Sequence, residues 1–258
     1  MQITTEQVKE LRDKTGVSVM QCKKALEEAG GDMEKALLIL KKKSTEIAAK
    51  KSDREATAGT LASAKNGDKA VILVLKCETD FVAKNADFVA IATSLANTAV
   101  NEGEEAAKTA AGQLISEGVQ KLGENIQLGD ILTVTAPTLG MYIHDGRVGT
   151  IVGLTGGTEA LAKDIAMHIA AMNPEYKTRA DVPADATEKV KVMFAEEVAA
   201  SGKPADIQEK MLNGKIDTFF KERTLLDQAF IKNPDMSIEK LLKDGGATLV
   251  TYVRAATN

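Results

Sequence analysis

The sequence predicts an α+β protein in which helices surround a core of β-hairpins. Apolar residues recur every three or four positions near both ends of the chain, which is the period of an amphipathic helix. Between residues 57 and 173, β-branched runs such as 70–77 (AVILVLKC) take over, accompanied by Asn-Gly and Asp-Gly dipeptides typical of hairpin turns. Aromatic residues amount to 3% and tryptophan is absent, so the cores must consist of aliphatic side chains.

Length and charge narrow the class of protein. The 258 residues suffice for one large or two to three small domains, and 44% hydrophobic with 27% charged residues is typical of globular chains. The net charge of −4 disfavours broad nucleic-acid binding, which needs clustered Lys and Arg, so we expect a protein surface as the target. Cys22 and Cys77 fit no zinc or redox motif, and neither a signal peptide nor a membrane segment is recognisable. We expect a cytoplasmic protein without membrane contact.

Residues 1–40 are expected to form three short helices. Thr4 or Thr5 can cap the first helix, Gly30-Gly31 stops the second, and Asp32 caps the third. Because so small a unit buries little area, its exposed apolar residues are candidates for a docking surface.

Residues 41–56 (KKKSTEIAAKKSDREA) form a basic linker, which carries six basic and two acidic side chains from Lys41 to Arg54. A solvated helical or flexible tether is the favoured interpretation of such a charge run. Contact with nucleic acid is the alternative, but we expect no direct contact of that kind.

Residues 57–138 are predicted to form the first subdomain, N, of an α+β core. A hairpin turning at Asn66-Gly67 leads through the loop 79–85 (TDFVAKN) to an apolar helix. We expect a further helix over 113–123 and a further strand over 131–135.

Residues 139–185 begin the second subdomain, C, and repeat this order. A strand over 140–144, an Asp145-Gly146 turn and a strand over 147–154 lead to a helix over 158–172. Because hairpin, loop and helix occur twice, we interpret the core as an internal duplication.

Residues 186–223 are predicted to be a helical hairpin, an antiparallel coiled coil. Apolar residues recur at four-residue spacing, and SGKP at 201–204 contains a glycine suited to a helix end and a proline suited to a helix start. Residues 224–258 complete subdomain C with a capped helix over 237–243 and a strand over 247–254 that rejoins the core sheet.

Catalysis is poorly supported by the sequence. His144 and His168 have no metal-ligand spacing, and no G-x-S-x-G, HExxH or Walker-type motif occurs. His168 lies on an apolar helix face and is expected to be a half-buried structural histidine, whereas His144 stands at a hairpin tip, as a turn residue or a partner contact. We expect no enzyme activity, no catalytic residue, no metal site and no cofactor.

The most informative segment is the loop 79–85. Asp80 and Phe81 directly follow a buried strand and precede a helix, in a chain with only six Phe. Residue types alone favour a structural role, with Asp80 capping the helix and Phe81 folded into the core. The alternative is that both side chains reach a partner.

Five segments together resemble the bacterial elongation factor Ts family, in that family's order. They are VKELRDKTGVSVMQCKKALEEAGGDMEKA (8–36), TDFVAKN (79–85), HDGRVG (144–149), IAMHIAAMNP (165–174) and SGKPADIQEKM (201–211). The resemblance implies a ubiquitin-associated-like three-helix domain at 1–40, the two-subdomain core and the coiled coil. Many family members carry a further C-terminal helix that contacts the partner, whereas this sequence stops at Asn258, so that contact is not expected.

The resemblance also implies a function, which is guanine nucleotide exchange on the GTPase elongation factor Tu during protein synthesis. In the family a wedge disturbs the magnesium and phosphate site of this partner, and its counterparts here are Thr79, Asp80, Phe81 and Val82. The partner's nucleotide-binding domain is touched by the counterparts of Leu11, Arg12, Val19 and Met20, and other parts of the partner meet the region near His144.

Two other classes of function fit some of these segments. A three-helix unit followed by a helical hairpin also suits a peptide-binding adaptor or chaperone-like protein, and the basic linker suits a ribosome-associated factor. An adaptor should bind regardless of nucleotide, and a ribosomal binder should show steep salt dependence.

Overall fold

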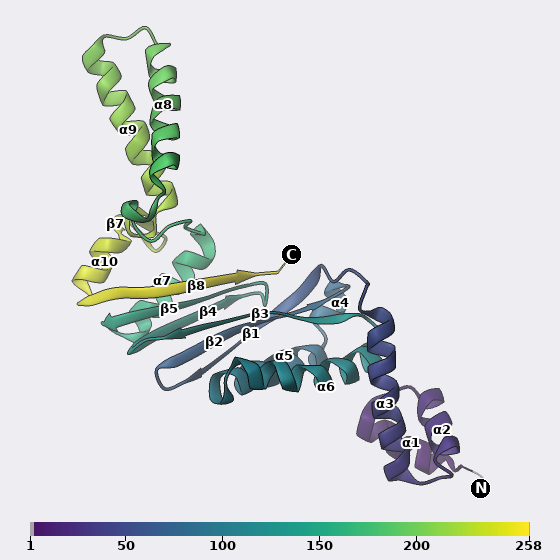
Figure 1. The fold of residues 1–258 in the computed structure, drawn as a ribbon. Helices are drawn as coiled ribbons and strands as arrows, with labels where there is room; N and C mark the ends of the chain where they lie inside the picture. Colours follow the sequence, from purple (N-terminus) through teal and green to yellow (C-terminus); the bar gives the residue numbers. More distant parts are fainter. Residues whose placement is uncertain (1–2, 258) are drawn as a thin grey trace. The chain divides into compact units, whose positions relative to one another are not determined.

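The structure, a computed structural model, describes residues 3–257 and combines helices with β-strands, which confirms the α+β class (Figure 1). Contacts divide the chain into two compact units. The first comprises Met1–Thr135, Ile143–Ile151 and Ala255–Asn258, and the second comprises Ala136–Tyr142 and Val152–Arg254. Each unit has buried clusters built mainly from aliphatic side chains, as the scarcity of aromatic residues predicts.

The first three helices are α1 (Thr5–Thr15), α2 (Val19–Glu28) and α3 (Met33–Lys51). Thr4 caps α1 through a capping box: its hydroxyl accepts from the N–H of Gln7 at 3.2 Å, and the Gln7 side chain accepts from the N–H of Thr4 at 3.1 Å. Asp32 caps α3 as predicted, and α3 then continues through much of the basic linker, which takes the helical form. The inner faces bury Val8, Leu11, Val17, Cys22, Ala25, Leu26, Ala36 and Leu40.

The first sheet has the antiparallel strand order β1-β2-β3, with β1 (Ala58–Asn66), β2 (Lys69–Cys77) and β3 (Ile126–Thr135). The predicted hairpin is present, but it turns one residue later than expected: Asn66 still pairs with Lys69, so Gly67, with a φ of +57°, and Asp68 form the turn. Helices α5 (Ala86–Glu102) and α6 (Glu104–Leu122) lie on one face of this sheet (Figure 1). Small side chains let α5 approach the sheet closely, and its buried residues include Phe88, Ala92, Leu95, Ala96 and Ala99.

Two of these elements are longer than predicted. Helix α6 starts at Glu104 and strand β3 at Ile126, both ahead of the expected ranges. The first half of α6 (EEAAKTAA) is rich in alanine and charge, so it shows no strong apolar stripe. In β3, a Cβ on Gly129 would lie 3.2 Å from the Cβ of Val74, so this glycine marks a close approach of two strands rather than a loop.

The second sheet has the order β4-β5-β8, with β4 (Thr138–His144), β5 (Val148–Gly156) and β8 (Ala247–Ala256). The last strand therefore rejoins the predicted hairpin, and α7 (Glu159–Met172) packs on the sheet. A Cβ on Gly140 would lie 2.1 Å from the carbonyl carbon of Ala162, so the glycine lets the α7 backbone touch the strand. The order hairpin then helix thus occurs in β1–β2–α5 and again in β4–β5–α7.

Helices α8 (Ala184–Ala199) and α9 (Ala205–Arg223) lie side by side and antiparallel (Figure 1). Lys215 links them, because its Nζ is 2.9 Å from Glu197 Oε1 and 5.5 Å from the centre of the Phe194 ring. Val198 is the buried residue of α8, and the residues of α9, all of which the structure describes, are half-buried or exposed. The pair therefore has a thin core.

The remaining elements are η1 (Arg179–Asp181), η2 (Leu225–Asp227), β6 (Ala229–Phe230), β7 (Asn233–Ser237) and α10 (Ile238–Asp244).

His168 on α7 is fully buried, deeper than the half-buried position expected for it. Its Nε2 lies 2.9 Å from Gln228 Oε1, and its Nδ1 accepts from the N–H of Ile231 at 3.4 Å. Because Nδ1 accepts, the proton of the neutral ring sits on Nε2 and is donated to Gln228. Burial lowers the pKa of His168, against the opposing effect of the Gln228 hydrogen bond. This histidine is a structural residue, satisfied inside the second unit.

The lowered pKa of His168 predicts a loss of stability in mild acid. Below pH ~6.5 the His168 ring is protonated in the unfolded chain but stays neutral in the folded chain. The free energy of unfolding therefore falls by at most about 1.4 kcal/mol for each unit by which the pH is lowered. Above pH ~6.5 the ring is neutral in both the folded and the unfolded state, so this contribution of His168 to stability is fully present. Denaturant unfolding of wild type and His168→Gln between pH 5.5 and 7.5 measures this, and equal slopes for the two proteins would contradict it.

Candidate partner-binding site

The loop singled out in the sequence contains one helical turn, α4 (Asp80–Ala83). Thr79 is its N-cap, since the Thr79 hydroxyl accepts from the N–H of Val82 at 3.4 Å. Asp80 is therefore not the cap that residue types favoured. It lies in the first turn, where its Oδ2 is 3.5 Å from the Nζ of Lys84, and both side chains are more than half exposed. The Asp80 carboxylate is thus accessible from outside.

Phe81 points out of the protein, with 84% of its surface exposed. Val82 packs partly against the sheet core, and Ala83 is buried there. The expectation that Phe81 folds into the core is wrong, because the two residues after it already supply the apolar contacts of this turn. An exposed aromatic ring on a turn held by packing is typical of a docking residue.

Two carboxylates hold the start of α4 against the turn that follows α6. Glu124 Oε2 accepts from the N–H groups of Glu78 at 3.1 Å and Thr79 at 2.9 Å, and Glu124 Oε1 accepts from the Thr79 hydroxyl at 2.5 Å. In return, Glu78 Oε1 accepts from the N–H of Asn125 at 2.6 Å. Beneath them the Cys77 thiol donates to the carbonyl of Thr79 at 3.1 Å. The sequence carries no signal for this pairing, because Thr79 and Glu124 lie 45 residues apart.

A second exposed surface lies on the first two helices. Met20 and Val19, at the start of α2, are 68% and 52% exposed, and Arg12 on α1 is exposed as well. Val19 and Arg12 line a cavity of about 280 Å³ whose other cations are Lys9 and Lys23. Leu11 differs, because it is fully buried among the three helices and supports this surface from within. The surface thus combines apolar side chains with positive charge.

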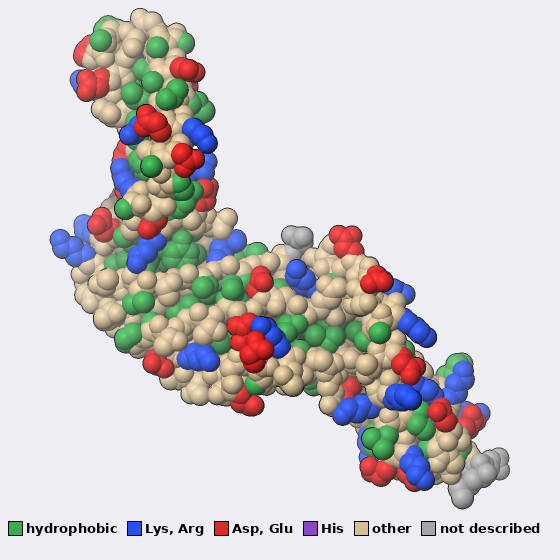
Figure 2. Space-filling model, in the orientation of Figure 1, with side chains coloured by type: hydrophobic (Ala, Val, Ile, Leu, Met, Phe, Trp, Pro, Cys, Tyr) green, Lys and Arg blue, Asp and Glu red, His purple; other side chains and the backbone are tan. Residues whose placement is uncertain are grey.

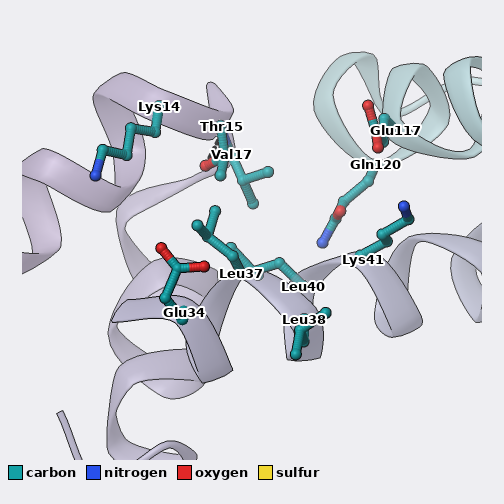
Figure 3. A pocket seen from close by; sticks show the side chains of 10 residues that line it. All are labelled: Lys14, Thr15, Val17, Glu34, Leu37, Leu38, Leu40, Lys41, Glu117 and Gln120. Carbon is teal, nitrogen blue, oxygen red and sulfur yellow. Dashed lines mark hydrogen bonds between the residues drawn. The ribbon is translucent and has the colours of Figure 1, made fainter. Parts of the chain in front are cut away.

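A second hollow, of about 310 Å³, lies between α1, α3 and α6 (Figure 3). Figure 3 shows Gln120 reaching from α6 toward these helices, where its Nε2 donates to Gln21 Oε1 at 3.0 Å. Lys41 of α3 donates to Gln113 Oε1 of α6 at 2.8 Å. Two hydrogen bonds thus join the first helices to α6 at this hollow.

His144 ends β4 at the predicted turn to β5. The N–H of Arg147 donates to the carbonyl of His144 at 2.9 Å, and Asp145 and Gly146 have positive φ values of 49° and 68°. The turn is pinned, since the carbonyl of Gly146 accepts from the N–H of Leu61 at 2.8 Å. The His144 Nε2 lies 3.8 Å from Asp145 Oδ2, and both side chains are more than half exposed.

The basic linker uses most of its cations for contacts within the chain. Lys43 pairs with Glu28 at 2.5 Å, Arg54 pairs with Glu78 at 3.5 Å, and Lys51 donates to the carbonyl of Gly123. Lys41 binds α6 as described above. Elsewhere, acidic and basic side chains are interspersed on the face drawn in Figure 2. This distribution favours a protein partner over a phosphate backbone.

Metal and membrane sites are not apparent in the described part of the chain. Within residues 3–257, no group of three or more His, Cys, Asp or Glu side chains could hold a metal ion. Within the same residues, no helix is both long enough and apolar enough to span a membrane.

The comparisons with known proteins all match one protein family. The family model described as elongation factor TS matches residues 78–258. A curated elongation factor Ts of Francisella tularensis subsp. novicida is 42% identical over 262 residues, covering 98% of this chain and 91% of that protein. The elongation factor Ts of Marinobacter nauticus is 42% identical over 259 residues, covering 98% and 90% respectively. That of Saccharophagus degradans is 41% identical over 263 residues, covering 98% and 91%.

Proposed function

Because this chain belongs to the elongation factor Ts family, we propose that it is the guanine nucleotide exchange factor of elongation factor Tu in translation elongation. It binds the GTPase and promotes release of GDP, without making or breaking a covalent bond. We place it in the cytoplasm, where translation elongation takes place, with no direct contact to nucleic acid or membrane.

A nucleotide exchange factor works by binding two forms of the GTPase with different affinities. A factor that binds the nucleotide-free GTPase more tightly than the GDP form must, by linkage, lower the affinity for GDP by the same ratio. The factor therefore needs side chains that compete with what holds GDP in place. In GTPases a magnesium ion bridges the phosphate oxygens and a hydroxyl of the phosphate loop, so displacing its surroundings loosens the nucleotide.

The observation that carries the proposal is the outward Phe81 on its fixed turn. We propose that Thr79, Asp80, Phe81 and Val82 form a wedge that enters beside the magnesium ion and phosphates of the partner. Phe81 supplies the apolar bulk, and the exposed carboxylate of Asp80 disturbs the charge around the ion. Thr79 caps the turn, and Val82 packs its inner side against the core.

One wedge is not sufficient for strong acceleration. Speeding release by about 10⁴-fold requires about 5.5 kcal/mol, whereas one aromatic anchor contributes about 2 to 4 kcal/mol. We propose that Arg12, Val19 and Met20 dock on the nucleotide-binding domain of the partner, with Leu11 holding them from inside. His144 and its pinned turn contact another part of the partner.

We also propose a domain assignment for each part of the chain. We propose that residues 1–40 form a ubiquitin-associated-like domain and that 41–56 link it to the core. Subdomain N (57–138) and subdomain C (139–185 and 224–258) derive from one duplicated unit, a view that the repeated order of hairpin and helix supports. Residues 186–223, which include most of α8 and all of α9, form an antiparallel coiled coil.

The direct test is release of fluorescent GDP from elongation factor Tu, followed with and without this protein. We expect release to accelerate with protein concentration and to saturate. A peptide-binding adaptor would bind the GTPase equally well with and without nucleotide and leave the release rate unchanged, which would overturn the assignment.

We predict that the α8–α9 pair contributes little to exchange. Replacing Asp185–Lys221 by a short Gly-Ser link should leave the rate of GDP release within about threefold of wild type, because the pair has a thin core and carries none of the wedge residues. Circular dichroism of the variant checks that the remainder is folded. A folded variant without exchange activity would refute this prediction.

A further inference from the structure

We propose that Glu124 is a positioning residue for Phe81, fixing the start of α4 so that the ring projects outward before the partner arrives. This inference rests on the proposed wedge function of Phe81. Neither sequence pattern nor position suggests a role for Glu124, which follows Gly123 at the end of α6. Its role emerges only from the three hydrogen bonds that its carboxylate accepts.

The three donors to Glu124 all belong to the segment that starts α4. Its Oε2 takes the N–H groups of Glu78 and Thr79, and its Oε1 takes the Thr79 hydroxyl. Donation to Glu124 fixes the rotation of this hydroxyl and directs a lone pair toward the N–H of Val82, which donates to it at 3.4 Å. The cap of α4 therefore depends on Glu124. All three contacts of the carboxylate lie within the chain, so we assign Glu124 to the support of α4 rather than to the partner's ion.

The turn that carries Glu124 is itself anchored. Asn125 is only 3% exposed, and its side-chain Nδ2 donates to the carbonyls of Arg54 at 2.6 Å and Ser52 at 3.3 Å. Its backbone N–H returns to the Glu78 carboxylate at 2.6 Å. The segment that starts α4 and the turn after α6 are thus joined by hydrogen bonds to one carboxylate from each, Glu78 and Glu124. The turn after α6 is also hydrogen-bonded to the residues that follow α3. Glu124 holds α4 from a fixed base.

Such a support matters because α4 is one turn long. A single helical turn has no stability of its own in water, since nucleation fixes several dihedral angles for one hydrogen bond. If the turn were loose, docking would have to order it, and each ordered residue reduces affinity by a factor of about 5 to 30. A ring that is already held outward avoids this loss. The exposure of Phe81 is then a consequence of the Glu124 contacts and of the packing of Val82 and Ala83.

Hydrogen exchange of the free protein tests the local part of this proposal. In Glu124→Ala we expect faster amide exchange at Val82 and Ala83, with α5 unchanged. Glu124→Gln should retain protection, because its amide oxygen can accept the two backbone N–H groups while its nitrogen donates to the Thr79 hydroxyl. Glu105→Ala is the matched control on α6, where an 88% exposed carboxylate pairs only with Lys108 among the ion pairs of the described residues. Unchanged exchange at Val82 and Ala83 in Glu124→Ala would overturn the proposal.

A double-mutant cycle on GDP release from elongation factor Tu tests the functional part. We expect Glu124→Ala to slow release by about tenfold in an otherwise wild-type chain and by less than about twofold when Phe81→Ala is already present. Glu124→Gln should restore most of the rate, and Glu105→Ala should match wild type. This pattern requires that Glu124 acts through the ring of Phe81.

The other outcomes are distinguishable. Equal slowing by Glu124→Ala in both backgrounds would show a general structural effect and overturn the positioning role. A full defect in Phe81→Ala with none in Glu124→Ala would show that a preset ring is unnecessary, while leaving the wedge intact. A normal rate for Phe81→Ala would remove the wedge itself, and the functional role of Glu124 with it, whatever hydrogen exchange shows.

Discussion

Replacing Phe81 by alanine should slow the stimulated release of GDP by at least about 30-fold, because truncating a central aromatic anchor costs about 2 to 4 kcal/mol. The melting temperature should change by less than about 2 °C, since the ring is 84% exposed and makes little contact within the chain. Stopped-flow release of fluorescent GDP and thermal unfolding measure the two quantities. Loss of about 3 to 5 kcal/mol of stability would instead mark Phe81 as a core residue.

Removing magnesium tests whether the wedge acts through the metal site of the partner, independently of whether the protein is an exchange factor. Chelating the ion should itself speed GDP release, so the protein should then add less acceleration. If the wedge acts through the metal site, Phe81→Ala loses most of its defect without magnesium, and Asp80→Asn follows it in part. A defect of equal size with and without the ion would move the disturbance to the phosphate loop or base pocket, with the exchange function retained.

The second large effect is expected at the surface of the first two helices. The double change Val19→Asp and Met20→Asp should weaken binding to elongation factor Tu by at least about 30-fold, because it places charge where two exposed apolar side chains dock. Folding should survive, since acidic residues are favourable in the first turn of a helix such as α2. Calorimetric titration measures the dissociation constant.

Leu38→Asp provides the matched control for this surface. Leu38 is 67% exposed on α3 and lines the hollow beside α6 rather than the cavity next to Arg12. We expect it to change the affinity by less than about threefold. Equal weakening by both variants would mean that the three helices respond to charge in general, and the assignment of Val19 and Met20 would fail.

Local signals predicted the elements that depend on local physics. Gly67, Asp145 and Gly146 adopt positive φ values in the two hairpin turns, a conformation that glycine and aspartate tolerate, and both hairpins are present. Asp32 caps its helix because a short acceptor side chain reaches the free N–H groups of the first turn. The start of α6 was missed because alanine favours a helix without leaving an apolar stripe.

The site was harder to predict, because it depends on contacts between distant segments. The direction of Phe81 could not be decided from residue type, since it depends on which of three consecutive apolar residues face the sheet. Leu11 and Arg12 are neighbours in sequence, yet one is buried and the other exposed, as the helical period dictates once the core is known. Glu124 carried no local signal at all, because its partners lie 45 and 46 residues earlier.

The thiol beneath the wedge has a consequence for the response to oxidants. Burial, aided by the negative charge of Glu124, raises the pKa of Cys77 to about 12. At neutral pH fewer than about one molecule in 10,000 then carries the thiolate, which is the form that peroxide oxidises. The Cys77 thiol, which donates to the carbonyl of Thr79 at the start of α4, is therefore expected to resist sulfenic acid formation at neutral pH.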